Sequence, residues 1–273
     1  MSATTITPHP RLRPAAGRAP GRVTPGNLVR SEWTKLWTVR STRWSLLAAF
    51  LLMLSGIAIA AIRVNSHPIP AHLSSIDMSV AGYHFAELAI AVLGVMVITG
   101  EYATGMIRSS LMAAPRRLPV LWAKLAVFAA VTLVTMLVAS FIAFFAVQAV
   151  VSGHGLQHAI TDQNALRTVI GAAVLMAGVG VLGTAVGALT RNTAAGISSV
   201  VALLWVLPVV ISLLPSSISN SVNPYLPSNA IASLASNTRA AHTLGPWAGL
   251  AVFAGYAAVL LAVAAVRLRR RDV

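Results

Sequence analysis

The chain has 273 residues, of which 57% are hydrophobic, and a mean hydropathy of +0.79, so it carries too little polar surface to cover a water-soluble domain of this size. Its formal net charge of +14 would indicate nucleic-acid binding in a soluble protein, but the basic residues lie between apolar runs, where membrane orientation explains them better. No cysteine is present, which excludes disulfides and thiolate metal sites.

The N-terminal region divides into a tail and an amphipathic segment. Residues 1–26 are rich in Pro, Gly, Ala and Arg and hold little to bury, so we predict a disordered basic tail whose charges can meet membrane lipids. From Leu28 to Trp44 the spacing predicts a helix with cations such as Lys35 on its polar faces and an apolar stripe made of Val29, Trp33, Leu36 and Trp37. This pattern is typical of a helix in the headgroup plane of a membrane, and a solvated linker is the alternative.

Residues 27–273 are expected to form one all-α transmembrane domain. Crossing a bilayer takes about 20 apolar residues in a helix, because every backbone amide must be satisfied internally. Six runs meet this requirement: 44–62, 82–100, 121–151, 169–189, 194–214 and 247–266. The third is long enough to tilt or to extend past the bilayer, and the first suits a retained signal anchor better than a cleaved signal peptide.

The basic residues predict the orientation of the six spans. If the N-terminus is cytoplasmic, seventeen of the twenty Lys and Arg residues lie inside, and only Arg63, Arg167 and Arg239 lie outside. The positive-inside rule therefore predicts that both termini are cytoplasmic. Eighteen of the twenty are Arg, which together with the high Ala content indicates a GC-rich bacterial genome. We expect a multi-pass protein of the bacterial plasma (inner) membrane.

The segment between the second and third spans carries the strongest functional signal. Glu101 ends one span, Gly105 breaks the helix, and a short apolar helix follows up to Pro115. Pro119 suits the first turn of the next span. A short helix with exposed apolar side chains between two spans fits docking into a groove of a partner protein. The docking residues that we predict are Glu101, Gly105, Met106, Ile107, Arg108, Leu111 and Met112.

In this segment the chain resembles the permease subunits of type-2 ABC exporters. The resemblance is carried by Glu-x-x-x-Gly-Met-Ile at 101–107, a Pro-x-Arg at 115–117 and Lys124 opening the third span. The Trp/Lys-rich helix before the first span, the Arg191-Asn192 turn and Pro227-Ser-Asn-Ala230 in the last outer loop are also similar to that family. The resemblance covers the chain from about Asn27 onward.

The resemblance has specific implications for partners and mechanism. It implies that residues 105–113 form a coupling helix seated in a cleft of a separate ATPase, and that Leu28–Arg43 is the connecting helix. It also implies an assembly of two ATPase subunits with two permeases, the second being a copy of this chain or a homologue. Closure of the ATPase pair on ATP would then be transmitted through these helices to open the bundle outward.

The chain lacks a phosphate-binding loop of its own. That loop requires Gly-x-x-x-x-Gly-Lys-(Ser/Thr), whereas the only lysines, Lys35 and Lys124, are each followed by Leu. We therefore expect no enzymatic activity and no cofactor on this chain. ATP and Mg would be bound by the partner subunit, and no nucleic acid is expected.

The second span contains two ionisable residues, His84 and Glu87. An ionised group in mid-membrane costs about 2.5–3.5 kcal/mol on insertion scales, so Glu87 should face protein or a water-filled path. His84, three residues earlier, can share its charge on the same helical face. A structural hydrogen bond, a substrate path or gate, and a position at the interface all remain open for this pair.

Two further patterns are weak. His154, His158 and Asp162 have the i, i+4, i+8 spacing that would align zinc ligands on a helix, but the neighbouring Gly153 and Gly155 favour a loop. The run Gly-Val-Gly-Val-Leu-Gly at 178–183 formally matches a dinucleotide fingerprint, yet it follows no strand and lies within a span.

Small residues and one proline shape the later spans. Gly183 and Gly187 form a small-x-x-x-small pattern, which predicts close helix packing. The partner helix is either in this chain or in a second copy. Pro208 is expected to kink the fifth span.

Other function classes are less well supported. An intramembrane enzyme would need paired His/Glu ligands, paired Asp or a Ser–His dyad, and neither Gly-x-Ser-x-Gly nor His-Glu-x-x-His occurs. The alternative to an export permease is an ion-coupled carrier or a non-transporting membrane scaffold. A carrier usually has inverted repeats and several intramembrane charges. The sequence does not identify a transported molecule, and it is compatible with a permease homodimer or heterodimer.

Overall fold

The computed structural model describes residues 24–66, 74–106, 117–162, 164–238 and 241–270. Within these ranges every regular element is helical and no strand occurs. Six segments are long and apolar enough to cross a membrane: Arg40–Asn65, Ser75–Ala103, Leu118–His154, Ala165–Thr190, Thr193–Ser212 and Pro246–Arg269. Each overlaps one predicted run, so the prediction of six membrane-length apolar helices is confirmed, and the chain is a helical multi-pass membrane protein. The predicted tail 1–26 lies almost wholly outside the described residues.

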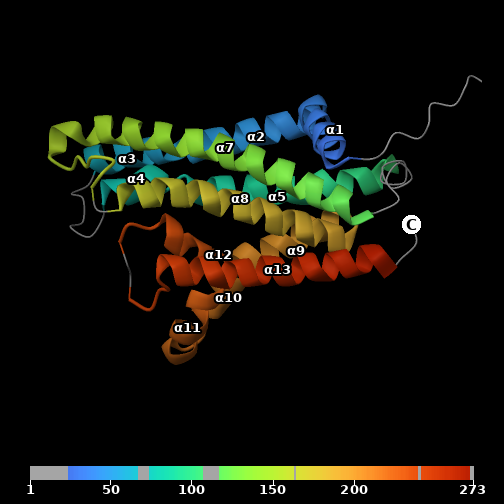
Figure 1. The fold of residues 1–273 in the computed structure, drawn as a ribbon. Coiled ribbons are helices and arrows are strands. Elements are labelled where there is room, and N and C mark those ends of the chain that lie inside the picture. The colour runs from blue at the N-terminus through green and yellow to red at the C-terminus, as the bar shows by residue number, and fades with distance from the viewer. Residues whose placement is uncertain (1–23, 67–73, 107–116, 163, 239–240, 271–273) are drawn as a thin grey trace, which may run out of the picture.

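The N-terminal helix α1 (Pro25–Thr38) is separate from the first span. The Thr24 hydroxyl accepts a hydrogen bond from the Asn27 N–H at 3.4 Å, and Pro25 occupies the first turn, where its missing N–H costs nothing. The helix ends because Val39 is extended, with φ −78° and ψ 113°. The helix predicted to reach Trp44 therefore stops six residues earlier. In Figure 1, α1 lies at one end of the bundle at an angle to α2.

Helices α2 (Arg40–Met53) and α3 (Ser55–Ser66) form the first span, and α4 (Ser75–Val80) and α5 (Tyr83–Ala103) form the second. The third span, α7 (Arg117–Val151), has 35 residues and is thus about 52 Å long. This length exceeds the hydrocarbon thickness of about 30 Å, as expected for the over-long third run. Figure 1 shows α7 running along most of the bundle.

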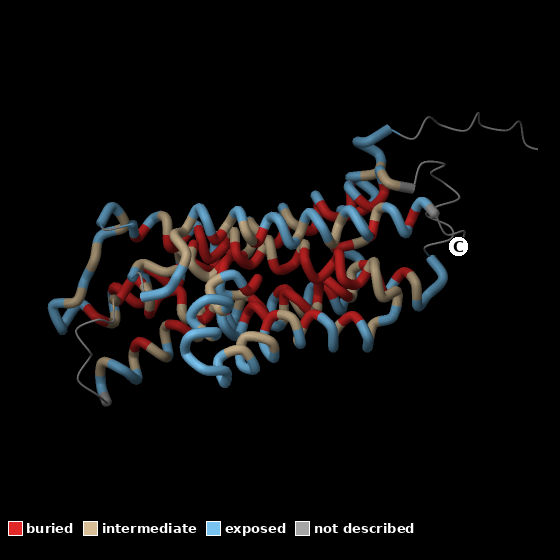
Figure 2. The backbone as a smooth tube through the Cα atoms, turned by 90° about the horizontal axis from the view of Figure 1, so that it is seen from below, coloured by how far each residue is buried: buried red, intermediate tan, exposed pale blue. Residues whose placement is uncertain are grey.

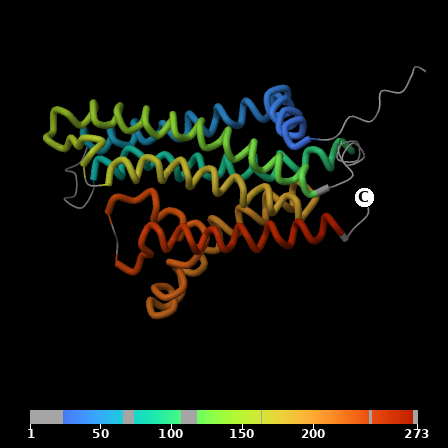
Figure 3. Tube along the Cα trace, in the orientation of Figure 1, coloured from blue at the N-terminus to red at the C-terminus, as the bar shows by residue number. Residues whose placement is uncertain are grey.

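Helix α8 (Ala165–Thr190) is the central helix of the bundle. Its most apolar window is 72% buried, against 17% for each of the last two spans. Figure 3 shows it between α7 and α13 (Pro246–Arg270), and Figure 2 shows the buried residues concentrated along the middle of the bundle. The exposed apolar side chains of the last two spans, such as Val209 and Val259, form faces available to lipid or to further protein.

Glycines set the close approach of α8 to α5. A Cβ at Gly94 of α5 would overlap the carbonyl oxygen of Gly180, and a Cβ at Gly183 would lie 2.5 Å from the carbonyl oxygen of Ala91. Gly187 likewise faces Val95 and Ile98 of α5. The Gly183/Gly187 face therefore packs against a helix of the same chain.

The fifth span is irregular at its middle. It consists of α9 (Thr193–Val201), a π-helical turn at Ala202–Val206 and α10 (Leu207–Ser212). Pro208 follows the turn and has no N–H to donate. In the wider turn the Leu207 N–H donates to the carbonyl of Ala202, five residues earlier, rather than to that of Leu203. Such π-turns are a typical way for a helix to continue past a proline.

The segment between the fifth and sixth spans folds back into the bundle. Helix α11 (Ser216–Val222) projects from it, whereas α12 (Pro227–Ala232) and the 3₁₀ turn Ser233–Ala235 lie between α8 and α13 (Figure 1). A Cβ at Gly171 of α8 would overlap the Leu234 carbonyl, and one at Gly249 of α13 would overlap the Ala230 carbonyl. This loop is therefore packed as tightly as the spans themselves.

Candidate functional site

Four charged side chains from three helices meet at the end of the bundle where α1 lies. We call Glu32, Lys35, Glu101 and Lys124 the charge cluster. Lys124 Nζ donates to Glu32 Oε2 at 2.7 Å and to Glu101 Oε1 at 2.8 Å. Lys35 Nζ donates to Glu32 Oε1 at 2.6 Å and to Glu101 Oε1 at 3.1 Å. The four contacts form a closed ring in which positive and negative groups alternate.

The cluster joins helices that are far apart in sequence. Glu32 and Lys35 lie one turn apart on α1, Glu101 lies in the last turn of α5, and Lys124 lies near the start of α7. Glu32, Glu101 and Lys124 are only 4%, 7% and 6% exposed. Buried charges are costly unless they are paired, and here two carboxylates balance two ammonium groups. The three helices can therefore be held together with each of these four charges paired.

Lys35 is the most exposed member of the charge cluster, with 26% of its side chain accessible. Burial by itself lowers the pKa of this ammonium group, but the hydrogen bond to Glu32 and the charges of Glu101 and Glu32 outweigh it, so the pKa is raised above its ordinary value. Lys35 therefore stays protonated at neutral pH, and the ring keeps its charge balance.

The charge cluster also fixes how α1 is turned. Glu32 and Leu36 are buried against the bundle, whereas Trp33 and Trp37 are 49% and 46% exposed, with ring centroids 5.8 Å apart. The stripe predicted from the sequence is thus divided, with Leu36 facing inward and the two Trp rings facing outward. Tertiary contacts with Glu32 decide this rotation, because a helical wheel alone cannot distinguish two adjacent faces.

Glu32 is the functional candidate that sequence reasoning missed. Its pairing in the middle of α1 depends on Lys124, which is 92 positions away in the sequence. One signal was available, since the chain has only two lysines and six acidic residues. Both lysines lie in the charge cluster, whereas every other cation of the chain is an Arg.

The predicted docking residues are placed only in part. Glu101 is buried in the charge cluster, so its carboxylate faces the bundle. Gly105 follows with φ +71°, a left-handed conformation that ends the α5 helix in a turn. Met106 is 46% exposed. The remaining predicted residues, Ile107, Arg108, Leu111 and Met112, lie outside the described residues.

His84 and Glu87 lie on different faces of α5. Glu87 is 6% exposed and His84 is exposed. The His84 ring lies against the Tyr83 ring, with centroids 4.0 Å apart and the ring planes tilted by 34°. Glu87 Oε1 is buried and makes no hydrogen bond within the part of the chain that the structure describes. The two residues therefore do not pair.

The residues considered as metal ligands make local contacts instead. His158 Nδ1 lies 2.9 Å from Ser75 Oγ, and Asp162 accepts the Ala159 N–H at 2.7 Å. Over the described ranges no group of three or more His, Asp or Glu side chains is arranged to hold a metal ion. The Ser75–His158 contact has the elements of a dyad, but Ser75 is only 1% exposed and its hydroxyl donates to the Leu156 carbonyl. A substrate cannot reach it, and the contact ties the loop after α7 to α4.

The charge cluster is thus the strongest candidate functional feature of the chain: it is buried, charged and shared by three helices. No family model and no curated protein matches this sequence. A functional assignment therefore depends on the residues themselves.

Proposed function

We propose that this chain is the membrane-spanning permease subunit of an ATP-driven exporter of the type-2 ABC class. Six membrane-length helices support the permease part of this proposal. The sequence resemblance at 101–124 supports the class, and the missing phosphate-binding loop leaves ATP to a partner. The proposed assembly has two ATPase subunits and a second permease, in a bacterial plasma membrane with both termini cytoplasmic.

One observation carries the proposal, namely that the charge cluster ties α1 to both helices that flank the segment 104–116. Glu101 is four residues before Gly105, at the entrance to that segment, and Lys124 lies just beyond its exit. A force applied to this segment by a moving ATPase would reach α1, α5 and α7 together, because buried ion pairs resist separation. In this mechanism Glu101 positions the docking segment and does not itself contact the partner.

The charge cluster also gives α1 a role. Its outward face carries Trp33 and Trp37, side chains that favour the boundary between headgroups and hydrocarbon. Its inward face is held by Glu32. Movement of the ends of α5 and α7 would therefore shift α1 along the membrane surface, as expected of a connecting helix.

We expect the triple substitution Met106→Asp, Ile107→Asp and Leu111→Asp to abolish docking of the ATPase. Apolar anchors dominate a helix-in-groove contact, and three carboxylates cannot be buried in an apolar groove. The chain is co-expressed with the ATPase encoded beside it, and the yield of co-purified ATPase and the ATP-driven export are measured. Both should fall at least tenfold, which corresponds to about 1.4 kcal/mol or more.

The matched control is Ser109→Asp with Ser110→Asp, which adds acidic charge to the same segment without removing an apolar anchor. This control should keep most of the co-purified ATPase. Normal yields and normal export from the triple variant would contradict the proposed docking.

An ion-coupled carrier is the second candidate, favoured by the buried Glu87, whose Oε1 has no hydrogen-bond partner among the residues that the structure describes. We expect Glu87→Gln to leave ATP hydrolysis by the assembled complex within about twofold of the wild type, since Gln keeps the shape and the hydrogen-bonding capacity of this side chain. His84→Gln, on the exposed face of the same helix, is the control. A proton flux through liposomes containing the chain alone that disappears in Glu87→Gln would favour the carrier.

A further inference from the structure

A polar cavity lies at the end of the bundle opposite the charge cluster. Its volume is ≈ 710 Å³, and its walls come from the starts of α5, α8 and α13, from α11 and from the segment between α11 and α13. Tyr83 and Glu101 occupy opposite ends of α5, so the cavity and the charge cluster are about 27 Å apart along the helix. That separation is close to the hydrocarbon thickness of about 30 Å. The cavity and the charge cluster thus belong to opposite faces of the membrane.

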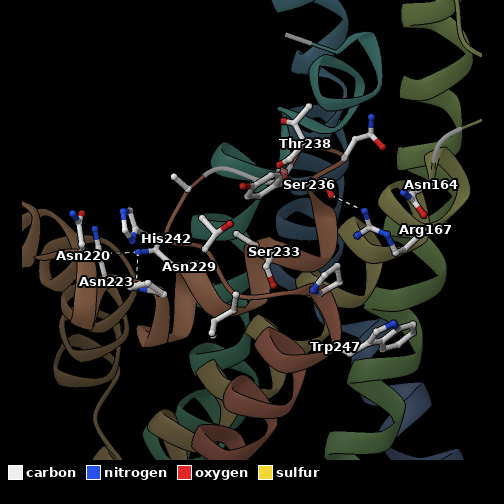
Figure 4. Close-up of a pocket in the computed structure, with 18 residues that line it drawn as sticks. Asn164, Arg167, Asn220, Asn223, Asn229, Ser233, Ser236, Thr238, His242 and Trp247 are labelled. Carbon is white, nitrogen blue, oxygen red and sulfur yellow. Dashed lines mark hydrogen bonds between the residues drawn. The ribbon is translucent and has the colours of Figure 1, made fainter. Parts of the chain in front are cut away.

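Five of the described lining residues carry an amide side chain: Asn164, Asn220, Asn223, Asn229 and Asn237. Figure 4 shows Asn220, Asn223 and Asn229 on one side and Asn164 beside Arg167 on the other. Asn229 Nδ2 donates to Asn223 Oδ1 at 2.9 Å, whereas the side chains of Asn164 and Asn220 make no hydrogen bond among the residues described. Each amide offers a donor and an acceptor side by side. The wall therefore presents paired donors and acceptors rather than one kind of group.

Arg167 is the one Arg among the described residues that line the cavity, and His242 is also part of this lining. The Arg167 guanidinium donates to the carbonyls of Leu234 and Ser236 at 3.0 and 2.9 Å, which fixes it against the wall. Asp77 lies behind this wall within electrostatic range of Arg167. It accepts hydrogen bonds from the Asn237 N–H and the Thr238 hydroxyl at 2.6 and 2.9 Å. The described residues of the lining include no Asp or Glu. The charge of Arg167 is thus offset by Asp77, and the described part of the wall offers many uncharged hydrogen-bonding groups.

Aromatic rings complete the lining. Trp247 in the first turn of α13 is 72% exposed, and Tyr83 lies at the start of α5. Trp and Tyr supply large, rigid contact areas at low entropic cost, and Asn supplies adaptable hydrogen bonding. An apolar ring beside convergent polar groups is the usual composition of a small-molecule site.

We propose that this cavity binds an uncharged, hydroxyl-rich ligand, namely a glycosyl unit, either as a free saccharide or as the headgroup of a glycolipid. Neighbouring hydroxyl groups donate and accept at once, as the amides do, and the apolar face of a sugar ring can lie against Trp247. Arg167 is a poor anchor for a phosphate group, because its guanidinium already donates to two carbonyls and lies within electrostatic range of Asp77. The inference does not depend on ATP-driven export, because it concerns binding to the chain by itself.

The test uses the full chain in phosphatidylcholine nanodiscs, purified without sugar-based detergents. Saturation-transfer NMR measures binding of free disaccharides containing glucose, galactose, mannose or N-acetylglucosamine. A parallel titration uses nanodiscs with glucosyl diacylglycerol or with phosphatidylglycerol. We expect at least one glycosyl probe to bind, and phosphatidylglycerol to give no comparable signal. Binding of a free disaccharide assigns the site to the sugar alone, whereas binding of glucosyl diacylglycerol only assigns it to a lipid headgroup.

Substitutions then locate the binding site. We expect Trp247→Ala to weaken binding about tenfold, the equivalent of one aromatic contact, and Asn220→Ala to weaken it severalfold. The matched control is Trp44→Ala, an equally exposed ring at 69% on α2, outside the cavity, which should bind as the wild type does. Absence of binding for every glycosyl probe, preferential binding of phosphatidylglycerol, or equal losses in Trp44→Ala and Trp247→Ala would overturn the proposal.

Discussion

Replacing Lys124 with Met is expected to destabilise the folded chain by about 3–5 kcal/mol, the usual cost of removing one partner from a buried ion pair. Lys124 is 6% exposed and donates to both carboxylates of the charge cluster. Without it, Glu32 and Glu101 would be buried with only Lys35 between them. The expected result is a lowered midpoint of denaturant-induced unfolding in mild detergent.

A second substitution separates lost charge from lost packing. Glu101→Gln added to Lys124→Met leaves Glu32 paired with Lys35 at 2.6 Å, so one positive and one negative group remain. We expect this double variant to regain at least half of the loss. Lys35→Met should cost less than Lys124→Met, because the Lys35 side chain is 26% exposed and solvent weakens its contacts. A double variant no more stable than Lys124→Met would show that charge balance does not hold the three helices together.

Gly94→Ala is expected to cost about 1–3 kcal/mol, the range for adding a methyl group to a well-packed core. The new Cβ would overlap the carbonyl oxygen of Gly180 on α8. Backbone cannot move aside as a flexible side chain can, so α5 and α8 would have to separate. The unfolding midpoint in detergent measures the loss.

The same helix offers a matched control. Gly100 on α5 has nothing within 4 Å of an added Cβ, so Gly100→Ala should be neutral or should stabilise α5 by up to about 1 kcal/mol through helix propensity. Equal effects from Gly94→Ala and Gly100→Ala would mean that the close contact of α5 with α8 does not limit stability.

The sequence determined the six spans because crossing a membrane is a local requirement. A run of about 20 apolar residues is needed wherever the helix packs, so 82–100 and 169–189 could be found without knowing their neighbours. The ends of the spans were less certain. The first span begins at Arg40, four residues before the predicted run, because the break at Val39 depends on how α1 turns against the bundle.

The glycines of α8 show what the sequence predicts about helix packing and what only the folded structure adds. The Gly183/Gly187 spacing predicted a close helix contact, since small residues at i and i+4 leave a flat face. The spacing does not identify which helix packs against this face. Only the packed structure places α5, with Ala91 and Val95, against that face.

The charge cluster was decided by the tertiary structure alone. Sequence patterns pointed to Lys35, Glu101 and Lys124 separately, and they did not single out Glu32. Its burial requires α1 to lie across the ends of α5 and α7, so that side chains 92 positions apart come within 2.7 Å. Periodicity describes one helix at a time, whereas an ion-pair ring between three helices exists only once their ends are brought together.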